Sequence, residues 1–122
     1  MKYLLMIYTN EKAWAELPAA ERQQFYAEFA PLREQIVKNG NYVAAEKLQD
    51  SSTATTVRVR DGKALLTDGP FAETREQLGG YFLVDAPDLN AAITIASRIP
   101  AARKGTVEVR PVIDIPNQPT AD

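Results

Sequence analysis

The segment from Lys2 to Tyr8 constrains the fold most strongly, because nearly all of its residues are apolar. Successive side chains of a β-strand point to opposite faces of the sheet, so a strand that is apolar throughout needs cover on both faces. The pattern therefore predicts a first strand buried between two layers. One face would present Tyr3, Leu5 and Ile7, and the other Leu4, Met6 and Tyr8.

Apolar residues at helical spacing predict two main helices, and Glu11–Leu17 predicts a short helical turn before them. The first main helix spans Pro18–Lys38. Pro31 lies inside it and should kink or divide it, because proline removes one backbone hydrogen bond. The second spans Leu89 to about Ile99, with Asp88 as its N-cap. The expected inner stripes are Phe25, Phe29, Leu32 and Ile36 in the first helix, and Leu89, Ile93, Ala96 and Ile99 in the second.

The remaining strands complete a β-α-β-hairpin-β-α-β order. Asp61-Gly62, between the apolar-alternating segments Thr55–Arg60 and Lys63–Thr67, predicts a hairpin with a two-residue turn. The order predicts an α+β fold, namely a ferredoxin-like βαββαβ sheet with an inserted β-hairpin. Residues 1–115 would form one domain, and residues 116–122 a disordered C-terminal tail. The other predicted strands are Tyr42–Leu48, Gly80–Val84 and Thr106–Ile113.

The second apolar face of this sheet bears on assembly. Two helices can cover only one face, yet Tyr81 and Leu83 lie opposite Phe82 and Val84 on one strand, as on the first strand. Left in water, the second face would form a larger apolar patch than monomers usually expose. We therefore expect a homodimer in which two sheets stack. The alternative is that the hairpin or the tail folds back over this face.

The composition excludes several kinds of chemistry. The 122 residues include neither cysteine nor histidine, so a thiolate nucleophile, a zinc–sulfur site and the usual general base near pH 7 are absent. We expect no cofactor and no metal. The net charge of −2 supplies no basic stripe for nucleic acid, and no apolar run approaches the roughly 20 residues that span a bilayer. The short apolar N-terminal run lacks a convincing cleavage site, so we expect a cytoplasmic protein without a membrane partner.

The most distinctive motif is Asp68-Gly69-Pro70-Phe71, inside the stretch Thr67–Tyr81. Together with Met1–Leu5, Thr55–Arg58 and Val107–Pro111, this motif makes the chain resemble the YCII-related family, specifically its DGPF branch, over about residues 1–113. The resemblance implies a dimeric α/β barrel. It also implies a regulatory association, because some DGPF relatives are encoded beside extracytoplasmic-function sigma factors.

The wider superfamily of this resemblance includes cofactor-independent monooxygenases, lactone isomerases and haem-dependent peroxidases, but shared architecture does not transfer a reaction. YCII-type members are thought to use a His–Asp pair. This chain has no histidine, so neither that pair nor a histidine-ligated haem can exist here. Only the carboxylate half of the pair remains, and Asp68 is its candidate.

Asp68 is the expected catalytic residue, since a carboxylate at the mouth of a partly apolar cavity can exchange protons near neutral pH. The alternative is structural: Asp68 accepts hydrogen bonds from the backbone of its own turn. Phe71, Glu73, Arg75 and Tyr81 are the expected ligand-binding residues around it, against the alternatives of a loop anchor, solvated charges and a buried structural tyrosine.

Three functions remain open at the level of sequence. The first is a small-molecule binding or regulatory protein, with its pocket near the Asp68–Phe71 loop. The second is a cofactor-independent enzyme that uses Asp68 as general acid or base. The third is a protein-interaction module linked to sigma-factor regulation.

Overall fold

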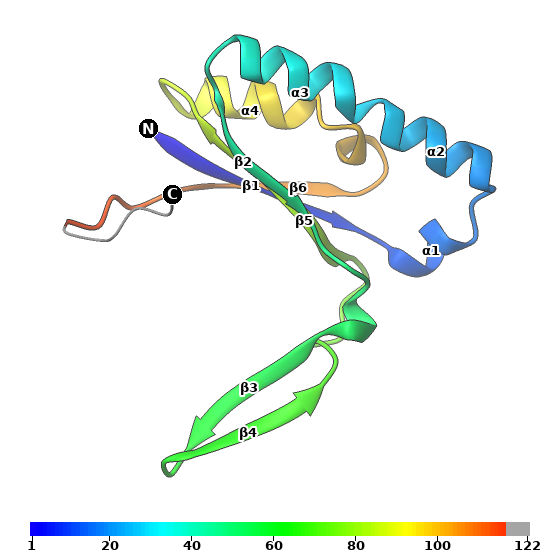
Figure 1. The fold of residues 1–122 in the computed structure, drawn as a ribbon, viewed down its shortest axis with the longest axis vertical. Coiled ribbons are helices and arrows are strands. Elements are labelled where there is room, and N and C mark those ends of the chain that lie inside the picture. The colour runs from blue at the N-terminus through cyan, green and yellow to red at the C-terminus, as the bar shows by residue number, and fades with distance from the viewer. Residues whose placement is uncertain (117–122) are drawn as a thin grey trace.

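A computed structural model of the chain describes residues 1–116. Its main sheet has four strands in the order β2-β5-β1-β6, and every neighbouring pair is antiparallel. This is the ferredoxin-like arrangement, so the predicted fold class is confirmed. Strands β3 and β4 form a separate two-stranded sheet (Figure 1). The elements are β1 (Lys2–Thr9), α1 (Glu11–Ala15), α2 (Ala19–Ala27), α3 (Phe29–Lys38), β2 (Tyr42–Lys47), η1 (Ser51–Thr53), β3 (Thr55–Arg60), β4 (Lys63–Asp68), β5 (Gln77–Asp85), α4 (Leu89–Ser97), η2 (Pro100–Arg103) and β6 (Thr106–Pro111).

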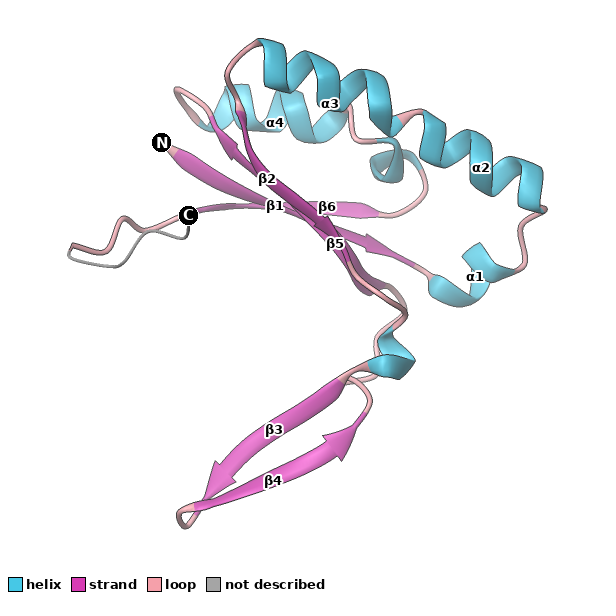
Figure 2. Cartoon of the chain, viewed as in Figure 1, coloured by secondary structure: helices cyan, strands magenta, loops and turns pink. Residues whose placement is uncertain are grey.

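The hydrophobic core lies between the main sheet and its helices. Helices α2, α3 and α4 all cover the same face of the sheet (Figure 2). On β1, Tyr3 and Leu5 point into this core and are buried, whereas Leu4 and Met6 alternate with them and are only half-buried. We call the second face, which no helix covers, the open face. Across β1 and β5 it presents Leu4, Met6, Tyr8, Leu78, Tyr81 and Leu83.

The long helix predicted over residues 18–38 is divided, but not at Pro31. Helix α2 ends at Ala27 and α3 begins at Phe29, so Pro31 falls in the first turn of α3. The first backbone N–H groups of a helix have no partner within it, so a proline there costs no hydrogen bond. The break therefore precedes the proline.

The inner stripe predicted for the second helix is partly wrong. Leu89 and Ile93 are each 47% exposed, while Ala92 and Ile95 are buried together with the predicted Ala96 and Ile99. Small residues let the helix backbone approach the sheet closely, so the alanine-rich side of α4 faces the core. The physical reason for the error is that the contact face of α4 is rotated toward Ala92 and Ile95, and so away from Leu89 and Ile93.

The hairpin predicted around Asp61-Gly62 is confirmed. Both residues have positive φ, 51° and 76°, as a two-residue type I′ turn requires. We call residues 55–68 the arm. Figure 1 shows the arm projecting from the end of the main sheet, on the side opposite the helices, so it does not fold back over the open face. Its whole length is exposed, except for the half-buried Thr56.

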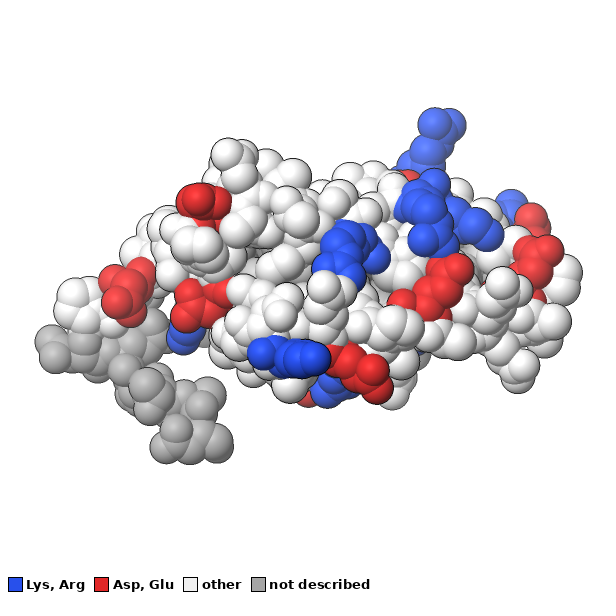
Figure 3. Space-filling view, turned by 90° about the horizontal axis from the view of Figure 1, so that it is seen from above, with Lys and Arg blue, Asp and Glu red and all other residues white. Residues whose placement is uncertain are grey.

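The predicted disordered tail lies, apart from Pro116, outside the residues that the structure describes. Among residues 1–116, no helix is long and apolar enough to cross a membrane. The helix-covered side of the molecule presents basic and acidic side chains close together (Figure 3), so its surface charge is mixed.

Candidate functional site

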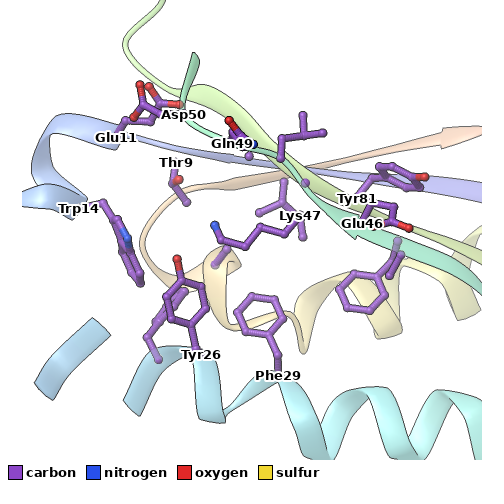
Figure 4. Close-up of a pocket in the computed structure, with 18 of the residues that line it drawn as sticks. Thr9, Glu11, Trp14, Tyr26, Phe29, Glu46, Lys47, Gln49, Asp50 and Tyr81 are labelled. Atoms are coloured by element: carbon purple, nitrogen blue, oxygen red, sulfur yellow. The ribbon is translucent and has the colours of Figure 1, made fainter. Parts of the chain in front are cut away.

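A pocket of about 750 Å³ opens between the helix-covered face of the sheet and the helices α1, α2 and α3. This volume lies in the range of small-molecule sites, which are typically concave and mostly apolar. One wall consists of Trp14 from α1, Phe25 and Tyr26 from α2, and Phe29 from α3 (Figure 4). The pocket therefore lies where the helical layer meets the N-terminal end of β5.

The aromatic wall is packed edge to face. The Trp14 ring lies 4.9 Å from Phe25 and 5.3 Å from Tyr26, centroid to centroid, and Phe25 lies 5.8 Å from Phe29. Phe29 in turn stacks on Phe82 of the sheet at 6.4 Å. Such contacts stabilise one ring arrangement beyond simple burial, so the wall presents a preformed surface.

The floor of the pocket is hollow because β5 lacks side chains there. In the sheet register, Ile7 of β1, Gly80 of β5 and Lys47 of β2 form one row on the helix-covered face. A Cβ atom at Gly80 would lie 2.8 Å from the backbone oxygen of Glu46. The close approach of β2 therefore requires glycine, and the absent side chain leaves space above the sheet.

Two carboxylates at the rim close the end of the pocket near α1. Glu11 accepts hydrogen bonds from the backbone N–H of Ser51 at 2.8 Å and from its hydroxyl at 2.6 Å. Asp50 accepts one from the N–H of Ser52 at 3.0 Å, and the hydrogen bonds from Ser52 lower the pKa of Asp50 below its ordinary value. Glu11 thus holds the 50–53 segment against the start of α1, while Asp50 caps the short helix η1 inside that segment.

Two basic residues also line the pocket. The Lys47 side chain reaches across it toward Trp14 and Tyr26 (Figure 4), and its Nζ lies 5.1 Å from the centre of the Tyr26 ring. The Arg33 guanidinium lies 5.1 Å from the centre of the Tyr42 ring and donates a hydrogen bond to the Tyr42 hydroxyl. A cation beside an aromatic face gains a modest attraction and keeps its charge available.

The sequence-predicted site residues do not gather at this pocket. Asp68 is the last residue of the arm, pairs with Thr55 and is exposed. Phe71 is 79% exposed in the loop that follows. Within residues 1–116 the Asp68 side chain accepts no hydrogen bond. No contact among these residues therefore supports the alternative in which Asp68 accepts hydrogen bonds from the backbone of its own turn. Glu73 and Arg75, in the same loop, are also exposed.

Tyr81 is the one predicted site residue that lines the pocket. It is half-buried and lies next to Glu46 at the end away from Trp14 (Figure 4). In the sheet register it pairs with Met6 and Glu46, so its side chain belongs to the open face and not to the aromatic wall. Sequence reasoning missed Trp14, Tyr26 and Lys47, and it placed Phe25 and Phe29 only in the core stripe. The sequence signal that could have indicated the pocket is the high density of aromatic residues between positions 14 and 29.

The side chains of residues 1–116 include no group of three or more acidic residues placed to hold a metal ion. The oxygen ligands at the pocket rim, Glu11 and Asp50, already accept hydrogen bonds from Ser51 and Ser52. The pocket's chemistry is therefore that of an aromatic cavity with polar and charged groups at its rim.

Comparison with known proteins gives the family. The family model of the YCII-related domain matches residues 1–116. The chain belongs to the YCII-related family. It is also 30% identical, over 114 residues, to an uncharacterised protein of Rhizobium meliloti (strain 1021), and the match covers 92% of each chain. The resemblance to the YCII-related family is thereby confirmed, and its DGPF branch stays a prediction.

Proposed function

We propose that this YCII-related protein binds a small organic molecule in the pocket between the sheet and helices α1–α3. The observation that supports this most is the preformed aromatic wall around a cavity of about 750 Å³. Buried apolar surface supplies most of the affinity for a small ligand, and a few polar groups fix its orientation. Here Lys47 and Arg33 are such groups at the edge of the aromatic wall.

The experiment is a binding screen by nuclear magnetic resonance on the nitrogen-15-labelled protein. Trp14 is the only tryptophan of the chain, so its indole N–H gives one unambiguous signal inside the pocket. A panel of small aromatic compounds of different charge should shift this signal together with the Gly79 and Gly80 amides. Failure of every compound to shift them would contradict the proposal.

A pair of variants controls for binding elsewhere. Ala30 lines the pocket and is exposed, so Ala30→Phe should fill the entrance and abolish the shifts while the protein stays folded. Ala27 is exposed one helical turn earlier and does not line the pocket, so Ala27→Phe should leave them unchanged. If the ligand-induced shifts disappear in both variants, or persist in both, the result would count against binding at this pocket.

We also infer that the protein is a homodimer, with the open faces of two sheets stacked. Leu4, Met6 and Leu83 are half-buried on that face, with Glu108 and Arg110 toward its β6 edge. An apolar centre with a polar rim is the usual make-up of an interface. A closed two-fold pair would cover both open faces at once, which is the commonest symmetry of soluble oligomers.

The arm supports the same assembly. Two-stranded hairpins are marginally stable alone in water, yet one side of the arm exposes Val57, Val59 and Leu66 at 59%, 61% and 69%. Six strand residues extend about 20 Å, whereas stacked sheets lie about 10 Å apart. Because the arm projects on the side of the open face (Figure 1), it would pass alongside a stacked second copy and contact it.

The catalytic role predicted for Asp68 would require the proposed dimer. Asp68 lies at the base of the arm, outside the pocket of its own chain. As a general acid or base it would act on a ligand near the partner's surface. If a ligand of the pocket is turned over, Asp68→Asn tests this role; binding without turnover favours the regulatory one.

A further inference from the structure

The basic groups of the pocket have no acidic partner among the residues that the structure describes. Within residues 1–116, neither Lys47 nor Arg33 forms an ion pair. Lys47 Nζ faces the Tyr26 ring, and the Arg33 guanidinium lies beside Tyr42. Both cations are therefore free to meet an anionic group that enters between the sheet and α2.

The acidic residues of the lining are placed elsewhere. Glu11 and Asp50 lie together at the α1 end, beyond Thr9 (Figure 4), where their oxygens accept hydrogen bonds from Ser51 and Ser52. Glu46 pairs with Tyr81 in the register, so its side chain points to the open face, opposite the Lys47 row. Of the charged residues that line the cavity, Lys47 holds its charge over a ring of the aromatic wall, 5.1 Å from the centre of Tyr26. Lys104, outside the lining, adds a second positive charge 5.8 Å from the Phe25 ring.

From this arrangement we propose that the pocket prefers an organic anion with a flat apolar body, namely an aromatic carboxylate. The inference rests on the proposed small-molecule function and names the ligand class. The ring system would pack against Trp14 and Phe29, and the carboxylate would accept a charge-assisted hydrogen bond from Lys47 Nζ. The ammonium would exchange its weak contact with the Tyr26 ring for this stronger bond.

The same arrangement opposes the other charge types. An organic cation would bring its charge toward the Lys47 ammonium, and two like charges repel each other. A neutral ligand of the same shape would gain the ring contacts alone. Affinity should therefore rank the carboxylate first, the neutral compound second and the cation last.

The test uses three compounds with one ring system: 2-naphthoate, 2-naphthalenemethanol and 2-naphthylmethylammonium. Each is titrated into the nitrogen-15-labelled protein, and the Trp14 indole signal gives the dissociation constant. One charge-assisted hydrogen bond corresponds to about tenfold or more in affinity, which is the margin expected for naphthoate over the alcohol.

Variants of Lys47 test whether this residue causes the roughly tenfold preference for naphthoate over the alcohol. Lys47→Gln should weaken naphthoate binding about tenfold while the alcohol binds as before, and Lys47→Arg should restore most of the loss. Lys63→Gln, a lysine of the arm outside the pocket, is the control and should change neither affinity. Equal binding of naphthoate and alcohol, tightest binding of the cation, or insensitivity to Lys47→Gln would overturn the ligand class alone. If none of the three compounds shifts Trp14, the proposed function itself fails.

Discussion

At the scale of single residues, Gly80 provides the open space at the base of the pocket. Its missing side chain leaves the space above β5, and the Glu46 carbonyl of the neighbouring strand occupies the position that a Cβ atom would need. A backbone oxygen cannot turn away as a side chain would, so any larger residue must push β2 from β5. The pocket and the tight β2–β5 pairing thus depend on the same residue.

Gly80→Ala should therefore lower the free energy of unfolding by about 1–3 kcal/mol, as overpacked sites do. Gly79→Ala is the matched control, because a Cβ atom there would meet its nearest neighbour, the Thr9 hydroxyl, at an ordinary 3.9 Å. Urea unfolding of both variants and the parent measures the difference. Equal stability of the two variants would contradict the packing argument.

The rim residue Asp50 should make stability depend on pH. Its hydrogen bonds from Ser52 lower its pKa in the folded protein, so the unfolded chain binds a proton more readily. This contribution is complete above the ordinary aspartate pKa of about 3.9 and is lost as the pH falls through the lower folded value. The stability gap between the parent and Asp50→Asn should shrink over that acidic range in urea titrations, and a gap independent of pH would contradict it.

At the scale of elements, the arm is the part that the proposed dimer would stabilise most. Val57 and Leu66 face each other across it on one side, whereas Leu65 lies on the other side opposite Arg58. Both leucines are exposed in the single chain, at 69% for Leu66 and 50% for Leu65. Only the Val57–Leu66 side is continuous in apolar residues, so we assign that side to the contact with a second copy.

Leu66→Asp should therefore shift the proposed dimer toward monomer, because it would place a charge in the proposed apolar contact. Leu65→Asp adds the same charge to the neighbouring residue on the opposite side and should leave the dimer intact. Light scattering at micromolar protein concentration measures the mass of each. A monomeric parent protein would contradict the proposed dimer. A Leu66→Asp variant that is still dimeric would show that this side of the arm does not contribute to the interface.

The elements themselves were largely predictable from the sequence, for local reasons. The Asp61-Gly62 turn and the alternating pattern around it need no information from the rest of the chain, and they gave the hairpin correctly. The direction in which the arm projects depends on the loops at residues 48–54 and 69–76, which carry no periodic signal. The burial of α4 was also beyond local reasoning, because Ala92 is selected by the closeness of the sheet and not by its hydrophobicity.

At the scale of the whole molecule, the pocket arises from segments far apart in the chain. Trp14 comes from α1, Lys47 from the edge strand β2, and Gly80 from β5. The sequence drew attention to the continuous motif Asp68–Phe71 because its residues are adjacent, whereas the pocket's residues become neighbours only through the β2–β5–β1 pairing. Of the expected site residues, only Tyr81 belongs to a core strand, and it alone lines the pocket.

The most direct test of the central claim, that this pocket binds a small organic molecule, is a crystal structure of the protein grown with 2-naphthoate. We expect the naphthalene ring between Trp14 and Phe29, with a carboxylate oxygen within hydrogen-bonding distance of Lys47 Nζ. An occupied pocket with the ligand in another orientation would keep the function and change the ligand class. An empty pocket at a saturating ligand concentration, with Lys47 still over the Tyr26 ring, would contradict the account.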